Sequence, residues 1–128
     1  MGKDPVACQR ITYRMAASEI SEVSVRRLLA RRRRLAAGLS DVERTLRGVL
    51  LEEGRRCSSE RCRCRRGELH GPYTYLAVYV GGRSRTIYVP ATAHAAAAAH
   101  VELTQRNEAL LLEISQINLE LLKRRALE

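Results

Sequence analysis

The chain has 128 residues, with five Tyr, no Trp, no Phe and a formal net charge of +9. A chain of this length has room for one small domain with helical arms, and its thin aliphatic core argues against a large enclosed catalytic pocket. No apolar run approaches the ~20 residues of a membrane-spanning helix, and the first residues lack the apolar stretch of a signal peptide. A cytoplasmic location is therefore expected.

The positive charge is concentrated in one part of the chain. Residues 26–66 hold fourteen Arg against five acidic residues, whereas the segments on either side are close to neutral. Arg keeps its charge and forms bidentate contacts with phosphate groups, so a local block of Arg favours a polyanionic partner, most often nucleic acid. The alternative is a solvated helix face in a chain that is generally rich in Arg.

The N-terminal part of the chain predicts a tail followed by helices. Residues 1–14 show no periodicity, and the predicted flexible tail extends to residue 17. Residues 18–54 are predicted to form a basic helical region, because Val and Leu recur in it at helical spacing. Ser40 to Glu43 has the form of a capping box, which predicts a second helical run that ends at Gly54.

Four candidate metal ligands follow this region. Cys57, Cys62, Cys64 and His70 have the spacing Cys-x4-Cys-x-Cys-x5-His. Three thiolates and one imidazole complete a tetrahedral structural zinc shell, which leaves no open position for catalysis. Clustered cysteines in the cytosol more often bind metal than form disulfides, and the many neighbouring Arg favour the thiolate form. The alternative is three reduced surface cysteines beside an unrelated His; Cys8 is expected to be free.

Two strands are predicted after the metal motif. Residues 73–80 are rich in Tyr and Val, Gly81-Gly82 is a hairpin turn signal, and residues 83–89 form the returning strand that Pro90 ends. Residues 55–90 therefore predict a zinc-binding motif joined to a two-stranded antiparallel hairpin.

The strand pattern separates tyrosines from aliphatic residues. With a two-residue turn, Tyr75 pairs with Tyr88 and Leu76 with Ile87, so the aliphatic side faces the helices and the Tyr side faces outward. A three-residue turn would shift this pairing. An exposed Tyr surface beside arginines is one way in which proteins hold single-stranded nucleic acid. The alternative is ordinary cross-strand aromatic packing.

Residues 91–128 predict a long C-terminal helix that resembles a coiled coil. The run Ala95–Ala99 has high helix propensity, and helical periodicity continues to about Leu122. A heptad pattern predicts a homodimer through six residues, with Asn at one core position. These residues are Leu103, Asn107, Leu110, Ile114, Ile117 and Leu121. The alternative is an intramolecular pair of helices, and both arrangements are compatible with one helical bundle.

The stretch from Cys57 to Pro90 resembles a small, uncharacterised bacterial family of unknown function. The shared pieces are Cys-x4-Cys-x-Cys, then Arg66-Gly67, His70-Gly71-Pro72-Tyr73, Gly81-Gly82 and Tyr88-Val89-Pro90. Members usually carry Gly-Lys-Pro after the first cysteine, whereas this chain has Ser58-Ser59-Glu60. The resemblance implies no activity. It does imply an accessory protein associated with a mobile element, with a protein of that element as a candidate partner.

Sequence motifs of catalysis are absent. There is no phosphate-binding loop, no His-Glu-x-x-His motif and no cluster of carboxylates for two metal ions, so the chain is not expected to be an enzyme. We expect a mainly α, α+β fold, in which long N- and C-terminal helices flank a small zinc motif and a two-stranded hairpin.

The expected function is that of a nucleic-acid-binding accessory protein, with DNA favoured over RNA. The alternative is a zinc-stabilised dimeric adaptor for protein–protein interaction. The predicted nucleic-acid contacts are Arg27, Arg31, Arg32, Arg33, Arg34, Arg55, Arg56, Arg61, Arg63, Arg65, Arg66, Tyr73, Tyr75, Tyr79 and Tyr88.

Overall fold

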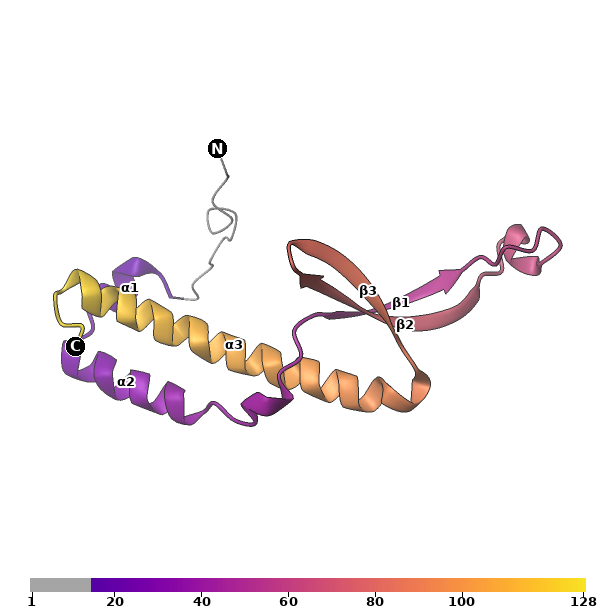
Figure 1. The fold of residues 1–128 in the computed structure, drawn as a ribbon. Coiled ribbons are helices and arrows are strands. Elements are labelled where there is room, and N and C mark those ends of the chain that lie inside the picture. The colour runs from indigo at the N-terminus through magenta and orange to yellow at the C-terminus, as the bar shows by residue number, and fades with distance from the viewer. Residues whose placement is uncertain (1–14) are drawn as a thin grey trace. The chain divides into compact units, whose positions relative to one another are not determined.

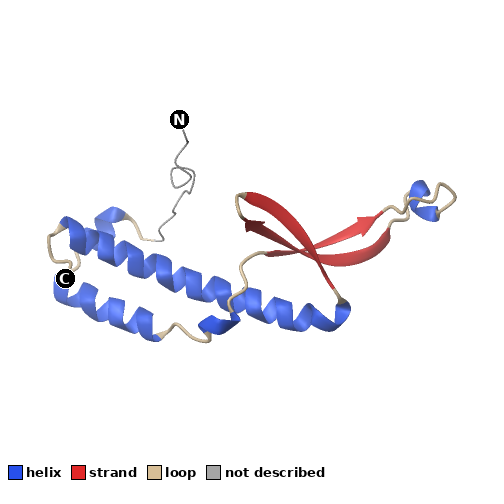
Figure 2. Cartoon of the chain, in the orientation of Figure 1, coloured by secondary structure: helices blue, strands red, loops and turns tan. Residues whose placement is uncertain are grey.

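The computed structural model describes residues 15–128, and the chain divides into two compact units (Figures 1 and 2). The helical unit comprises residues 15–40 and 107–128 of the described chain, and the sheet unit comprises residues 41–106. Most of the predicted flexible tail, residues 1–17, and Cys8 lie outside the described residues.

The helical unit contains two helices from the N-terminal part and the end of a long third one. Helix α1 is Ala17–Ser21, α2 is Val25–Ala37, and α3 is His94–Lys123. The long C-terminal helix is thus confirmed, with 30 residues. The predicted long helix in the N-terminal region 18–54 is wrong: its first part forms two separate helices, α1 and α2. The chain is extended at Ser24, whose hydroxyl accepts a hydrogen bond from the Arg27 N–H and caps α2.

An aliphatic core holds the helical unit together. Ile20 of α1, Leu28 of α2, and Ile117 and Leu121 of α3 are buried against one another. Arg124 adds three hydrogen bonds to the backbone carbonyls at the end of α1 and just after it, on Ile20, Ser21 and Val23. These contacts join elements that lie about a hundred residues apart in the sequence.

The sheet unit contains a three-stranded antiparallel sheet in the order β1-β2-β3 (Figure 2). Strand β1 is Val49–Arg55, β2 is His70–Val80 and β3 is Arg83–Val89. The predicted two-stranded hairpin is therefore wrong in its strand number, because β1 pairs with the free edge of β2. The register of the hairpin itself is confirmed, with Tyr75 opposite Tyr88 and Leu76 opposite Ile87.

The predicted helix over residues 40–54 is replaced by one turn of 3-10 helix, Val42–Arg44, and by β1. Two side chains of α3 explain the change. The amide of Asn107 hydrogen-bonds both backbone groups of Ser40, and the Thr104 hydroxyl accepts the Leu46 N–H at 2.7 Å. An α-helix would need that Leu46 N–H for its own i to i−4 bond, so the capping box does not form.

One side of the sheet packs against the first part of α3. Leu76 and Val89 are buried with Val101, and Leu46 and Leu50 pack against them. Residues directly opposite in an antiparallel sheet share a face. The aliphatic side therefore faces the helix, as predicted, and the side with the tyrosines is the one that this core leaves uncovered.

Candidate metal centre and tyrosine face

The connection between β1 and β2 carries the candidate metal ligands. This segment, residues 56–69, is called the cysteine loop below, and it lies at the end of the sheet (Figure 1). Cys57 follows β1, Cys62 and Cys64 flank the start of the 3-10 turn Arg63–Arg66, and His70 is the first residue of β2. The antiparallel pairing of Arg55 with His70 brings the two ends of the loop together.

Two glycines permit this close approach. Gly71 has a φ of +105°, and a Cβ at this position would lie 2.7 Å from the backbone nitrogen of Tyr73. Gly54 lies at the bulge between Glu53 and Arg55, and a Cβ there would lie 2.7 Å from the Cβ of Leu69. Larger residues at either position would push the ends of the loop apart.

The four candidate ligands converge on one point. Their ligand atoms all lie within 4.8 Å of one another and could hold a metal ion. The Cys57 and Cys64 sulfurs are 3.6 Å apart, and the Cys62 sulfur lies 3.0 Å from Nε2 of His70. A tetrahedral shell with Zn–S bonds of ~2.3 Å separates its sulfurs by about 3.8 Å, so the donor set and its spacing fit such an ion.

The loop backbone supports the thiols. The Cys57 N–H donates to the Cys64 sulfur at 3.3 Å, and the Arg65 guanidinium donates to the Cys57 carbonyl at 3.2 Å. Hydrogen bonding from the Cys64 backbone, followed by that of the Cys57 and Cys64 thiols, lowers the pKa of Cys62 to about 7. This thiol is therefore close to its ligand form at neutral pH.

Cys57 differs from Cys62 in its titration. A hydrogen bond with the Ser59 backbone lowers its pKa, but the hydrogen bonds of Cys62 and Cys64, together with desolvation, outweigh this effect and leave the pKa raised. A bound cation would favour the thiolate form of each cysteine.

The tyrosine face adjoins this centre. The term denotes Tyr73, Tyr75, Tyr79 and Tyr88, which lie on the side of the sheet opposite to Leu76. Tyr79 is 75% exposed and Tyr88 is 55% exposed, whereas Tyr75 is only 8% exposed. The face is therefore largely open to solvent.

Both predicted arrangements of the tyrosines contribute. The Tyr88 ring packs edge-to-face with Tyr73 at 6.3 Å and with Tyr75 at 5.9 Å between ring centroids. The Arg55 guanidinium lies 4.4 Å from the centroid of Tyr75. Cross-strand packing and a cation–π contact thus fix the centre of the face and leave its outer rings exposed.

A cavity of about 330 Å³ links the two features. It is lined by Arg55, Arg56, Cys57, His70 and Tyr73, all in the sheet unit. Two guanidinium groups and an aromatic ring therefore border the same hollow as two of the candidate ligands. Sequence reasoning missed this cavity because it depends on β1, whose strand character the helical pattern of Val and Leu concealed.

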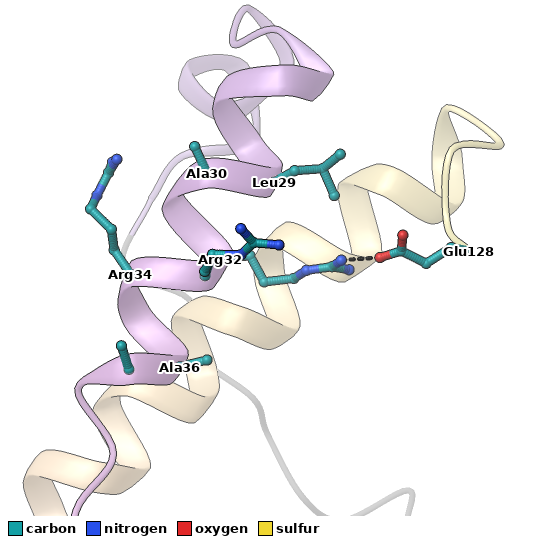
Figure 3. A pocket seen from close by; sticks show the side chains of 8 residues that line it. Leu29, Ala30, Arg32, Arg34, Ala36 and Glu128 are labelled. Atoms are coloured by element: carbon teal, nitrogen blue, oxygen red, sulfur yellow. Dashed lines mark hydrogen bonds and ion pairs between the residues drawn. The ribbon is translucent and has the colours of Figure 1, made fainter.

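The predicted arginine contacts fall in both units. In the cysteine loop, Arg56, Arg61, Arg63, Arg65 and Arg66 are exposed. In α2, Arg32 forms an ion pair with Glu128 (Figure 3). Arg32 also donates a hydrogen bond to Asn118, and Arg31 forms an ion pair with Glu113 at 3.4 Å. The remaining predicted residues of α2, Arg27, Arg33 and Arg34, are exposed.

Three of the six predicted dimer residues are buried within the chain, and Leu103, Leu110 and Ile114 are half-buried. Ile117 and Leu121 are buried against α1 and α2, and Asn107 bonds the Ser40 backbone. The structure therefore shows the intramolecular alternative for the helices, and a homodimer stays a prediction. No helix among residues 15–128 has the length and apolar character that crossing a bilayer requires.

A family model described as a domain of unknown function (DUF6788) matches residues 25–98. The chain belongs to this family. The DUF6788 match begins at the first residue of α2 and ends within α3, so it includes the whole sheet and the cysteine loop. The chain has no match among curated proteins and none among solved structures.

Proposed function

We propose that the sheet unit is a nucleic-acid-binding module without catalysis of its own, stabilised by a structural zinc ion. The observation that carries this proposal is the concentration of exposed arginines on the cysteine loop, whose three Cys side chains converge with that of His70 on one point. The tyrosine face and the cavity beside it lie in the same unit.

The donor set supports zinc in a structural role. Three sulfurs and one imidazole nitrogen supply all four positions of a tetrahedral ion and leave none for water or substrate. Apart from Cys64, the cysteine loop buries no side chain, so it has little apolar packing to hold it in place. A bound ion would supply that stability.

The charge of the loop supports a phosphate-bearing partner. From Arg55 to Arg66 there are six arginines and one acidic residue, Glu60. Guanidinium groups bind phosphate in bidentate geometry, and each phosphate that they neutralise releases counterions. The arginines of α2 are weaker candidates, because Arg31 and Arg32 are held by acidic groups of the helical unit.

The test compares two triple variants of equal charge. Arg61→Ala/Arg63→Ala/Arg66→Ala removes three exposed loop charges, and Arg27→Ala/Arg33→Ala/Arg34→Ala removes three from α2. The loop variant should make the slope of log K against log salt shallower by about two for single strands. The α2 variant should reduce this slope less than the loop variant does. Equal slopes for the loop variant and the wild type would overturn the proposal.

An adaptor role is a second candidate, supported by the helical unit. Leu111, Leu112, Leu119 and Leu122 of α3 are exposed leucines outside its buried core. Leu111 and Leu122 are eleven residues apart, which places them on one line along the helix. A cavity of about 770 Å³ also lies along α2, with Leu29 and Ala36 among its lining residues (Figure 3). Recovery of one specific protein after nuclease treatment would favour this role.

A further inference from the structure

We infer that the tyrosine face binds single-stranded nucleic acid by stacking unpaired bases on its exposed rings. This inference rests on the proposed function and names the ligand that the sheet unit selects. It concerns Tyr73, Tyr79 and Tyr88 as stacking rings, with Tyr75 as their support.

The sheet has one packed side and one open side. Leu76 and Val89 point into the core formed with Val101, and both are buried. On the opposite side lie the four tyrosines, the exposed residues Val49, Leu51 and Glu53 of β1, and the exposed residues Ser84 and Thr86 of β3. The exposed tyrosine, valine and leucine side chains form an apolar patch of the kind that marks interaction surfaces.

Three of the four rings, Tyr73, Tyr75 and Tyr88, are held in position before any ligand arrives. Tyr75 is nearly buried, with Arg55 against its ring and Tyr88 edge-on to it. Tyr88 in turn meets Tyr73 at an interplanar angle of 74°. A fixed platform loses little conformational entropy on binding, and every nucleobase has a π-face that can stack on it.

The positive charge lies where a strand on this platform would place phosphates. Arg55 belongs to the platform itself, and Arg56 lines the cavity next to Tyr73. The arginines of the cysteine loop continue the positive charge beyond that edge of the sheet. Aromatic rings bordered by guanidinium groups complement a chain of bases and phosphates, and this complementarity selects nucleic acid over a neutral or basic peptide.

A duplex cannot stack its bases on the tyrosine face. Its bases are stacked on one another and paired, so exposed rings on a sheet meet only its backbone. A single strand of DNA or RNA can turn its bases onto the tyrosines. The structure therefore predicts preference for a single strand over a duplex with the same number of phosphates.

The experiment measures binding of full-length, zinc-loaded protein to a labelled single-stranded oligonucleotide and to a hairpin duplex of equal phosphate count, as DNA and as RNA. The wild type should bind the single strand at least tenfold more tightly. Tyr79→Ala should weaken single-strand binding about five- to hundredfold and leave duplex binding unchanged. Tyr79 has little packing to lose, since it is 75% exposed.

Two further variants separate stacking from folding. Tyr88→Phe keeps the ring and should bind like the wild type, whereas Tyr88→Ala should lose single-strand affinity. Ile87→Ala removes an exposed side chain from the other side of the same strand and should have no effect. The wild type should quench the fluorescence of 2-aminopurine placed in a single strand. Tyr79→Ala should quench it less.

The outcomes distinguish this inference from the proposed function. Equal affinity for single strand and duplex would overturn base stacking even if salt-dependent binding remained. Single-strand affinity of Tyr79→Ala equal to that of the wild type would do the same. If the protein binds none of the four oligonucleotides (single-stranded and duplex DNA and RNA) at low salt, the proposed function and the stacking inference are both overturned.

Discussion

The helical unit and the cysteine loop of the sheet unit are stabilised by different means. In the helical unit, Leu28, Ile117 and Leu121 are at most 1% exposed, so burial of aliphatic surface favours the fold. In the cysteine loop, Leu69 is 48% exposed and Cys64 is the buried residue. One part of the chain thus has an apolar core, and the other has little apolar packing but carries converging thiols and an imidazole that could hold a metal ion.

This difference assigns separate roles to the two regions. A loop without a core of its own can carry many charges close together if a bound metal ion orders it, as proposed above. A packed helical unit places its arginines beside acidic partners, as Arg31 and Arg32 show. The loop is therefore the better candidate for contact with an external polyanion.

Loss of one candidate metal ligand should have the largest effect on zinc content and local order. The loss of order should be confined to the cysteine loop. Cys62→Ser is expected to abolish stoichiometric zinc, since structural zinc sites in zinc-finger peptides contribute about 10–16 kcal/mol of binding free energy at pH 7. Native mass spectrometry measures the ion, and hydrogen exchange should rise in residues 56–69. Protection of α2 and of the second half of α3 should stay as in the wild type.

Cys8→Ser provides the matched control, because it makes the same chemical change outside the described residues. It should retain one zinc ion per chain. Equal metal content in Cys62→Ser and Cys8→Ser would remove the metal centre from this account.

A core truncation in the helical unit should give the second largest effect. Leu121→Ala is expected to lower the free energy of unfolding by about 2–5 kcal/mol, since Leu121 is fully buried and its removal leaves a cavity. Zinc content should stay unchanged. Leu122→Ala, at the next position and 58% exposed, should change stability by less than about 0.5 kcal/mol. Similar losses in the two variants, measured by urea unfolding, would contradict the assigned core.

Two glycine substitutions in and beside the cysteine loop should have smaller effects on stability and zinc affinity. Gly67 and Gly71 have nearly equal φ values, +104° and +105°, but only Gly71 is crowded by the Tyr73 backbone. Alanine at either position incurs the backbone strain of a positive φ, about 1–3 kcal/mol. Gly71→Ala should lose additional stability and zinc affinity. Equal zinc affinity in the two variants would show that the loop ends need no close approach.

The sequence predicts the cluster of Cys57, Cys62, Cys64 and His70 and the hairpin register because both depend on local spacing. The interval between Cys62 and Cys64, and the two-residue turn at Gly81-Gly82, leave few geometric alternatives. The zinc assignment and the nucleic-acid contacts remain proposals.

The third strand was not predicted, because the deciding contacts are distant in the sequence. Leu46 and Leu50 have helical spacing, but Leu46 reaches the core from the irregular segment before β1, and Leu50 reaches it from β1. Thr104 and Asn107 redirect residues 40–46 through hydrogen bonds that span more than fifty positions. The heptad pattern predicts that Asn107 lies in a homodimer interface, since the pattern does not reveal that Ser40 is its hydrogen-bond partner.

The most direct test of the central claim is single-strand binding before and after metal removal, measured at several salt concentrations on the same preparation. We expect the zinc-loaded protein to bind with a steep negative dependence of affinity on salt concentration. Removal of zinc should weaken binding at least tenfold and flatten that dependence, because the loop arginines lose their arrangement. Equal affinity and equal slope with and without the ion would contradict the claim that a metal-ordered loop presents these arginines to nucleic acid.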